Sequence, residues 1–437
     1  MRRHPLLALT LIPLACWLGF ILPDLLAAET GPWAWRRALI LLSGILALWW
    51  MSAGMLLATR PAWLENVFGG LDKLYRLHKN FGIGAGVLIL LHWQLEWLPK
   101  TLAKAGLIAR PGGRGPKPPK DWLVDLAKDV GEWAGYILMA LVVIALIRRI
   151  PYRYFRLVHK VFPLVFLAGA FHGLLLMPKD FWQTPLAWLT LAVAAVGVVP
   201  ALLSLAGRIG RSRQHAAQID SIETCPDRVL LVGLRPTAQW PGHTAGQFVF
   251  ADFGHRGEGP HPFTIASAWS PDDGTLTLAI KALGDYTATL AQRLTVGQPV
   301  MLEGPYGRFD FAEDKAEHQV WIAGGIGVTP FLARLQALAE QPEHGRLVDF
   351  FYCLPRRHPG DVTDQLQALC AATGVRLHLR ETDSDGQLDP AEVKAALQTS
   401  GSVWFCGPRT WGEALQRKLQ ASGLLPGQFH RELFEFR

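Results

Sequence analysis

The chain has 437 residues, half of them hydrophobic, which is long enough for about three domains. Its formal net charge is +7, but the second half has no basic helix and no basic stretch interleaved with aromatic residues, which argues against nucleic-acid binding. The five cysteines have no close spacing, so neither a disulfide framework nor a zinc or iron–sulfur site is indicated. Their scatter suits a reducing compartment for the second half.

The hydrophobic residues gather in the first half, in six segments of about the 20 residues that cross a bilayer. These segments are 5–28, 38–59, 80–98, 132–148, 160–177 and 184–206. Tryptophans lie near many of their ends, as in the aromatic belts of membrane proteins. The first segment follows Met1, Arg2 and Arg3 and also resembles a signal peptide, but its length favours a retained transmembrane helix.

Basic residues predict the orientation in the membrane. The N-terminus and segments 60–79, 148–160 and 208–213 fall on one side and are rich in lysine and arginine, which makes that side cytoplasmic. The loop between Pro99 and Gly131 is also basic and would face outward, so the orientation depends on the other segments. We therefore expect a multi-pass protein of the cell (inner) membrane, in contact with lipid, whose second half is cytoplasmic.

Two stretches that extend these spans at their N-terminal ends, residues 75–98 and 152–177, carry two histidines each, and ionisable residues inside a membrane mark functional sites. Fourteen residues separate His78 from His92, which on a helix is a rise of roughly 21 Å and nearly four whole turns. Both rings therefore share one face at different depths. If the segment with His159 and His172 runs the same way, each depth has one histidine from each helix. This predicts two bis-histidine haems, one held by His78 and His159 and one by His92 and His172.

The second helix fits this arrangement less well. Thirteen residues separate His159 from His172, which leaves the rings roughly 140° out of phase on a straight helix. Pro163 lies between them and can kink the helix. Small residues on both helices either leave room for a flat macrocycle or let the helices pack closely; these are Gly82, Gly84, Gly86, Gly169 and Ala170.

After residue 215 the pattern changes to short strands separated by turns, which predicts a small antiparallel barrel. The strands are RVLLVGL, GQFVFADF, HPFTIASA, TLTLAIKAL and QPVMLEG. From His318 onward, four strands alternate with helices, which predicts a parallel sheet with helices on both faces.

The segment IAGGIGVTPF, residues 322–331, is typical of a strand, a glycine turn and a helix start. Its glycines would let backbone amides approach a pyrophosphate at the helix N-terminus, although Pro330 departs from the G-x-G-x-x-G pattern. The next strand is followed by Arg356 and Arg357 instead of an acidic residue, which favours the 2′-phosphate of NADPH, with NADH as the alternative.

The motifs HPFTIAS, KALGDYT, GPYG, GGIGVTPF and FCGP follow one another as in ferredoxin-reductase-type flavoproteins. Together with the histidine pairs, they make the chain from residue 38 onward resemble the ferric reductase and NADPH oxidase superfamily, in a bacterial-type form without added regulatory domains. The resemblance implies an α-helical membrane bundle of about six transmembrane helices, a six-stranded-type antiparallel β-barrel FAD domain and a Rossmann-like α/β NAD(P) domain. Their expected bounds are 1–210, 216–312 and 317–437.

The resemblance also implies the residues of the soluble sites. FAD would be bound by His261, Pro262, Phe263, Thr264, Ser267, Lys281, Gly284, Asp285, Tyr286, Thr287 and Gly304. The nicotinamide cofactor would be bound by Gly324, Gly325, Gly327, Val328, Thr329, Arg356, Arg357, Cys406, Gly407 and Pro408. Cys406 beside the nicotinamide and Phe436 against the flavin are the candidate catalytic residues. Phe434 is the alternative to Phe436, and edge-strand packing is the alternative role of both.

The expected function is electron transfer from cytoplasmic NADPH through FAD and two haems, of b type, to an acceptor outside the cytoplasm. A flavin accepts a hydride and releases its electrons singly, as haem iron requires. The acceptor would be a small molecule, either a ferric chelate or dioxygen that gives superoxide. The alternative is a membrane electron-transfer subunit that donates to a partner protein, which the sequence does not identify. The spans lack the broken, charge-bearing helices of a transporter.

Overall fold

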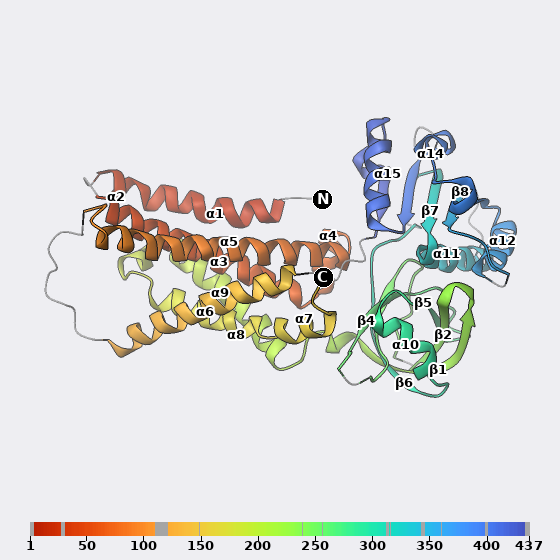
Figure 1. Ribbon diagram of the computed structural model, residues 1–437, viewed down its shortest axis with the longest axis horizontal. Helices are drawn as coiled ribbons and strands as arrows, with labels where there is room; N and C mark the ends of the chain where they lie inside the picture. Colours follow the sequence, from red (N-terminus) through yellow and green to blue (C-terminus); the bar gives the residue numbers. More distant parts are fainter. Residues whose placement is uncertain are drawn as a thin grey trace. The chain divides into compact units, whose positions relative to one another are not determined.

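The structure is a computed structural model, and it describes residues 4–27, 31–109, 121–147, 149–237, 239–255, 257–311, 314, 316–341, 346–359, 361–397 and 401–432. The chain forms two compact units, which divide near residue 210. The first unit is helical and the second contains two β-sheets (Figure 1).

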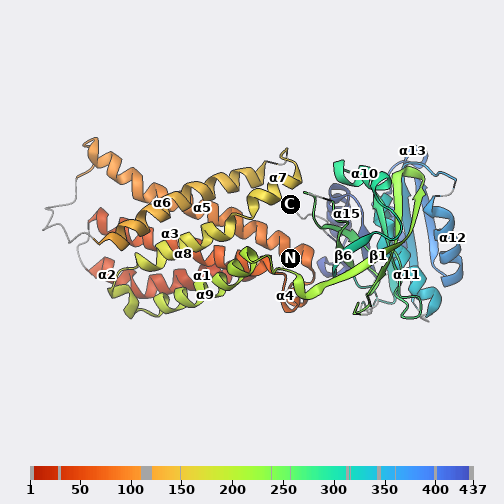
Figure 2. The same cartoon turned by 90° about the horizontal axis from the view of Figure 1, so that it is seen from below.

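The helical unit matches most of the predicted spans. Its helices are α1 (His4–Phe20), α2 (Leu22–Ala27), α3 (Pro32–Ala58), α4 (Ala62–Phe68), α5 (Leu71–Lys104), α6 (Trp122–Leu146), α7 (Tyr152–His159), α8 (Phe162–Leu175) and α9 (Pro185–Leu205), with the 3₁₀ turn η1 (Asp180–Gln183). In the described part of the chain, five helical segments are long and apolar enough to cross a membrane: α3, α5, α6, α9 and the Tyr154–Leu175 segment of α7 and α8. The five spans predicted after residue 37 are therefore confirmed, and the long helices run side by side along one direction (Figure 2).

The first predicted span differs from the structure. The single helix expected over 5–28 is divided at Ile21 into α1, which has 17 residues, and the short helix α2. Pro23 explains the division, because proline has no backbone N–H to donate to the carbonyl four residues earlier.

A second break separates α7 from α8. Helix α7 ends at His159, and α8 begins at Phe162 with Pro163 in its first turn. Proline is favoured in a first turn because a backbone N–H at that position has no helical partner, so its absence removes no helical hydrogen bond. The break absorbs the phase difference that a straight helix would impose between His159 and His172.

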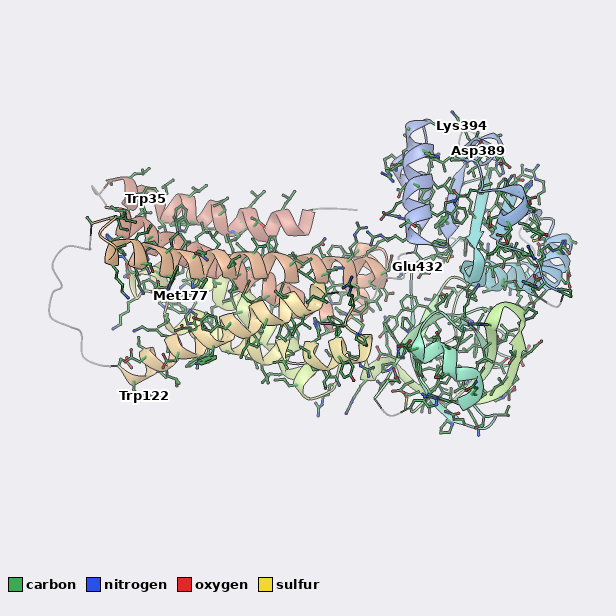
Figure 3. All side chains as sticks on the ribbon, in the orientation of Figure 1. Trp35, Trp122, Met177, Asp389, Lys394 and Glu432 are labelled. Atoms are coloured by element: carbon green, nitrogen blue, oxygen red, sulfur yellow. The ribbon has the colours of Figure 1, made fainter. Side chains whose placement is uncertain are left out.

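The ends of the helical unit can be assigned from the chain direction. Trp35 near the start of α3, Trp122 at the start of α6 and Met177 after α8 lie toward the same end (Figure 3). We call this the Trp35 end. The last turns of α5 and α8 reach the same end, because α5 runs opposite to α3, and α8 runs opposite to α6.

The first sheet of the second unit is the predicted barrel. Its strands are β1 (Gln214–Cys225), β2 (Val229–Pro236), β3 (Phe248–Asp252), β4 (His261–Thr264), β5 (Leu276–Lys281) and β6 (Pro299–Tyr306), in the order β4-β3-β6-β1-β2-β5 with antiparallel neighbours. A bridge between Ile265 and Leu278 joins the two edge strands and closes the sheet. Helix α10 (Asp285–Arg293) follows β5. The strand β1 was not predicted, because its sequence is largely polar.

The second sheet has five parallel strands in the order β11-β10-β7-β8-β9. They are β7 (His318–Gly324), β8 (Leu347–Leu354), β9 (Arg376–Glu381), β10 (Ser402–Cys406) and β11 (Phe429–Arg431), and the helices are α11 (Thr329–Glu340), α12 (Val362–Thr373), α13 (Thr382–Asp385), α14 (Pro390–Ala396) and α15 (Arg409–Ala421). Alternate residues of β7 enter two separate cores, with Trp321 on one face and Val320 and Ile322 on the other. The predicted two-faced parallel sheet is confirmed, and β11 adds a fifth strand at its edge.

Candidate functional site

The four membrane histidines form two facing pairs. The ring centroids of His78 and His159 are 5.8 Å apart, and those of His92 and His172 are 6.3 Å apart. Two imidazoles that each bind one metal ion through a bond of about 2 Å have centroids about 6 Å apart. The spacing of both pairs therefore suits a metal ion between the rings.

Hydrogen bonds orient three of these rings. Nδ1 of His78 donates to the carbonyl of Gly54 at 2.8 Å, and Nδ1 of His172 donates to the carbonyl of Ala127 at 2.8 Å. Nδ1 of His92 donates to the carbonyl of Ile40 at 3.0 Å. Each bond places the proton on Nδ1 and leaves Nε2 free to bind a metal, as in the histidine ligands of metalloproteins.

His159 differs from the other three histidines. Its Nδ1 is buried and has no hydrogen-bond partner among the residues that the structure describes. The rings of Phe155 and Phe162 flank it, with centroids at 5.0 and 4.6 Å. Aromatic packing in place of a hydrogen bond therefore holds this ring, so the two pairs are not equivalent.

Glycines let the helices approach the histidines. A Cβ at Gly131 of α6 would lie 2.0 Å from Nδ1 of His172, and a Cβ at Gly44 of α3 would lie 3.3 Å from the ring of His92. Contacts under 3.0 Å do not occur between real side-chain carbons and their neighbours, so Gly131 is required where His172 lies. Neither glycine was predicted, because the need for each arises from a neighbouring helix.

The small residues predicted to leave room for a macrocycle have different surroundings. A Cβ at Gly82 or Gly169 would meet nothing within 4 Å in the described structure, which fits a flat group beside these positions. Gly84, in contrast, makes room for Trp50, since a Cβ there would lie 1.8 Å from the indole. A Cβ at Gly86 would lie 3.2 Å from Val142. Helix packing therefore explains Gly84 and Gly86.

The residues predicted to bind FAD lie on β4 and around the start of α10. Phe263 is buried in the barrel core, and Pro262 and Thr264 alternate with it and are half-buried on the opposite face of β4. The ring of His261 stacks on that of Tyr286 with centroids 4.3 Å apart. Burial raises the pKa of Tyr286 to about 12, helped by Asp252 and Glu258, so its hydroxyl is protonated at neutral pH.

The start of α10 is a turn around Gly284 and Asp285. The hydroxyl oxygen of Thr287 accepts hydrogen bonds from the backbone amides of Leu283 and Gly284, each at 3.1 Å. Gly284 and Asp285 are exposed. The turn thus presents the N-terminus of α10 to solvent, a position that suits a phosphate.

Three other predicted FAD residues have structural roles in the barrel. The hydroxyl of Ser267 accepts a hydrogen bond from the amide of Thr277 at 3.0 Å. Gly304 has φ of +151°, a conformation that side chains other than glycine rarely adopt, and a Cβ there would lie 3.1 Å from Val249. Lys281 is the last residue of β5.

The predicted nicotinamide residues gather at the carboxyl edge of the parallel sheet. Gly324 ends β7, the turn η4 (Gly325–Val328) follows it, and α11 begins at Thr329. A Cβ at Gly327 would lie 2.3 Å from the carbonyl oxygen of Cys406 at the end of β10. The glycine turn therefore packs against the end of the neighbouring strand, where open parallel sheets bind nucleotides.

The arginines predicted to select NADPH lie at the same edge, just after β8, and both are exposed. The backbone amide of Arg357 donates to the Glu381 carboxylate at 3.2 Å, and its guanidinium lies 3.8 Å from Asp364.

Cys406 is buried at the end of β10, with 2% of its surface exposed. Burial raises the pKa of its thiol well above the usual range, and the nearby Glu432 adds to this effect. The thiol is therefore protonated at neutral pH. Gly407 and Pro408 follow it and lead into α15. The other candidate catalytic residue, Phe436, and its alternative Phe434 lie outside the described residues.

Comparison with known proteins agrees with these two units. Residues 43–170 match the family described as ferric reductase like transmembrane component, and residues 214–328 match the family described as FAD-binding domain. Respiratory burst oxidase homolog protein E of Arabidopsis thaliana is 31% identical over 211 residues, which is 41% of this chain and 21% of that protein.

Two further proteins are similar over parts of the chain. A superoxide-generating NADPH oxidase heavy chain of Dictyostelium discoideum is 26% identical over 48% of this chain and 43% of its own length. Among solved structures, the FAD/NAD-binding domain of nitric oxide dioxygenase from Vibrio cholerae has 22% identity and a TM-score of 0.44, over 50% of this chain and 98% of that one. The chain thus spans less than half the length of both curated relatives.

Proposed function

The chain belongs to the ferric reductase and NADPH oxidase superfamily, and from this premise we propose that it is a transmembrane oxidoreductase. It moves electrons from cytoplasmic NADPH, through FAD and two b-type haems, to an acceptor across the cell membrane. The acceptor is a ferric chelate or dioxygen. The matches to a transmembrane family and an FAD-binding family in one chain support an oxidoreductase. We further propose the residues named below as its cofactor sites and the outward direction of electron transfer.

The observation that carries the proposal is the pair of facing histidines at each of two depths. His78 and His159 would hold one haem, and His92 and His172 the other, through the Nε2 atoms left free by the bonds at Nδ1. A haem supplies a carrier of single electrons. The carbonyls of Gly54, Ile40 and Ala127 keep three of the imidazoles in the tautomer and orientation that this ligation needs.

In the soluble unit, the carboxyl edge of the parallel sheet would bind the nicotinamide cofactor. The turn from Gly324 to Gly327 offers backbone amides to its pyrophosphate, and Arg356 and Arg357 offer guanidinium groups to a 2′-phosphate. The exposed start of α10 at Gly284 and Asp285 would receive the phosphates of FAD. A bound flavin converts the two-electron donation of a hydride into single-electron transfer. The buried, neutral thiol of Cys406 lies at this edge.

The first test is an anaerobic absorption spectrum of the detergent-purified chain before and after NADPH addition, with haem and flavin quantified. We expect two low-spin haems per FAD, both reduced by NADPH, and about one haem per FAD after His92→Ala. Flavin without haem would refute the central claim and leave a membrane-anchored flavin reductase.

The acceptor is tested on the same preparation. Superoxide formation that falls when a ferric chelate is added would indicate that both compete for one exit. A chain that NADPH reduces but that turns over neither oxygen nor a ferric chelate would support the alternative function, an electron-transfer subunit that donates to a partner protein.

A further inference from the structure

Helix α5 contains a proline one turn beyond Leu95. The helix continues through Pro99 to Lys104, but proline has no backbone N–H. The carbonyl of Leu95, four residues earlier, therefore loses the donor that an ordinary helix would supply. Lipid cannot replace it, so inside a membrane such a carbonyl needs a donor from the protein.

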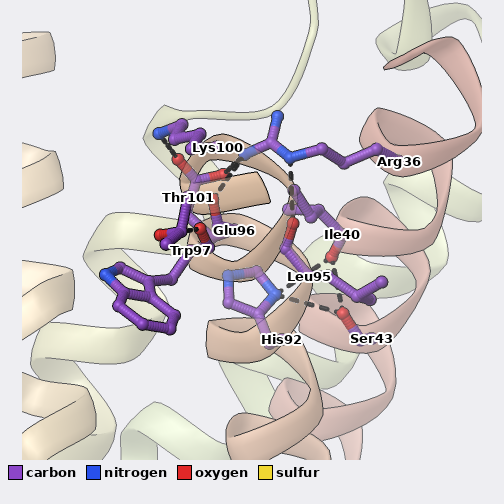
Figure 4. Close-up of polar contacts among 9 residues, drawn as sticks. All are labelled: Arg36, Ile40, Ser43, His92, Leu95, Glu96, Trp97, Lys100 and Thr101. Atoms are coloured by element: carbon purple, nitrogen blue, oxygen red, sulfur yellow. Dashed lines mark hydrogen bonds and ion pairs between the residues drawn. The ribbon is translucent and has the colours of Figure 1, made fainter. Parts of the chain in front are cut away.

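Arg36 of α3 supplies this donor. Its Nε donates to the carbonyl of Leu95 at 2.9 Å, and its Nη2 donates to the carbonyl of Glu96 at 3.0 Å (Figure 4). The same Nη2 also pairs with the carboxylate of Glu96. The side chain of Arg36 is only 12% exposed, so its hydrogen bonds form largely away from water.

The same face of α3 holds His92. Ile40 lies one turn after Arg36, and its carbonyl accepts the hydrogen bond from Nδ1 of His92 at 3.0 Å. The hydroxyl of Ser43 lies 3.2 Å from the same nitrogen and donates to the carbonyl of Ile40 at 3.0 Å. His92 is one turn before Leu95 and Glu96 on α5. Two adjacent sets of bonds thus join the same turns of α3 and α5.

We propose that Arg36 is a positioning residue for His92, an inference that rests on the proposed role of His92 as a haem ligand. By occupying the carbonyl that Pro99 leaves without a donor, the guanidinium holds the last turns of α5 against α3. The ring of His92 then meets Ile40 through Nδ1 and presents Nε2 to His172. Loss of the guanidinium lets α5 move relative to α3, and the ligand geometry changes with it.

The test is a comparison of Arg36→Gln, Pro99→Ala and the double variant, each purified as the full chain. In Arg36→Gln we expect the haem-to-FAD ratio to fall from two toward one, and the low-spin electron paramagnetic resonance signal of the affected haem to shift. Pro99→Ala restores a backbone N–H at that position, so on its own it should change neither readout. The double variant should recover the haem ratio and the signal, because the restored N–H again satisfies Leu95.

Arg37→Gln is the matched control, because Arg37 is the next residue on the same helix and is exposed. It removes the same charge at nearly the same depth and should keep two haems. Three results would overturn the inference: an Arg36→Gln variant with two haems and an unchanged signal, an equal loss in Arg37→Gln, or a double variant that fails to recover. The last would mean that Arg36 acts through its charge. A wild-type chain without two haems would instead refute the proposed function.

Discussion

At the scale of single residues, the backbone around the histidines matters as much as the rings. The carbonyls that orient His78, His92 and His172 come from Gly54, Ile40 and Ala127 on neighbouring helices. Main-chain acceptors cannot be removed by a side-chain change, but their distance from a ring depends on how closely two helices approach. A small residue at the crossing is therefore part of the proposed ligand site.

Gly131 gives a prediction of this kind. In Gly131→Ala the new methyl group would overlap His172, so the ring must turn away or α6 must move. We expect the variant to lose one of two haems per FAD while keeping its flavin, measured by the pyridine haemochrome assay and flavin release. Gly135→Ala is the control one turn later, where among the described residues a Cβ would meet only Ile89, at 3.9 Å. Two haems per FAD in Gly131→Ala would contradict the expectation that this contact controls the position of His172.

At the scale of elements, a buried carboxylate joins three strands of the parallel sheet. Asp349 of β8 accepts hydrogen bonds from Nε2 of His318 on β7 at 2.8 Å and from Nε2 of His378 on β9 at 2.8 Å. The guanidinium of Arg376 on β9 donates to it at 2.6 Å. Only 4% of the Asp349 side chain is exposed. These bonds lie toward the amino ends of the strands, away from the edge that carries the glycine turn.

Asp349→Asn should therefore destabilise the second unit without touching the proposed cofactor sites. Loss of the charged acceptor should cost about 2–3 kcal/mol, which lowers the melting temperature by about 5–10 °C. The melting temperature can be followed by flavin fluorescence of the full chain in detergent. Asp364→Asn, whose side chain is 71% exposed, should change it little. An unchanged melting temperature in Asp349→Asn would mean that the cluster contributes nothing to stability.

The same carboxylate predicts a pH dependence. Burial alone would raise the pKa of Asp349, but the hydrogen bonds from His378 and His318 and the charge of Arg376 hold it below its ordinary value of 3.8. A carboxyl whose pKa is lower in the folded state stabilises the fold above its unfolded-state pKa. That contribution is lost as the pH falls through the folded-state value. The melting temperatures of wild type and Asp349→Asn should thus converge only below pH 3.8.

At the scale of the whole molecule, much of the architecture could be predicted because it follows from hydrophobic patterns that extend over whole helices and strands. Five spans, the antiparallel barrel and the parallel sheet follow from runs of hydrophobic residues and their alternation. Fourteen residues between His78 and His92 indicate one helix face by arithmetic alone. The break after His159 follows from the local Pro163, whereas the need for glycine at position 131 and the bond from Arg36 to Leu95 depend on contacts between helices far apart in sequence. The polar strand β1 is a strand chiefly because β2 and β6 flank it.

The orientation of the whole chain yields another prediction. If the basic segments 60–79, 148–160 and 208–213 face the cytoplasm, the proposed nucleotide site faces it too. NADPH does not cross membranes, so added NADPH should reduce the chain in inside-out vesicles. It should do so in right-side-out vesicles only after they are permeabilised, as followed by haem absorbance under anaerobic conditions. Equal reduction in intact vesicles of both kinds would contradict the orientation.

The depth difference between the two histidine pairs also determines how strongly the membrane voltage would act on electron transfer between them. On α5 the pairs are separated by a rise of roughly 21 Å, about two thirds of a hydrocarbon layer of about 30 Å. Moving one charge across the whole membrane changes its electrical energy by about 2.3 kcal/mol at 100 mV. The energy of each electron would therefore change by roughly 1.5 kcal/mol as it passed between the pairs. A negative interior would push the electron outward, and each transfer would discharge that voltage. Sustained turnover would therefore require a compensating outward flow of protons or other cations.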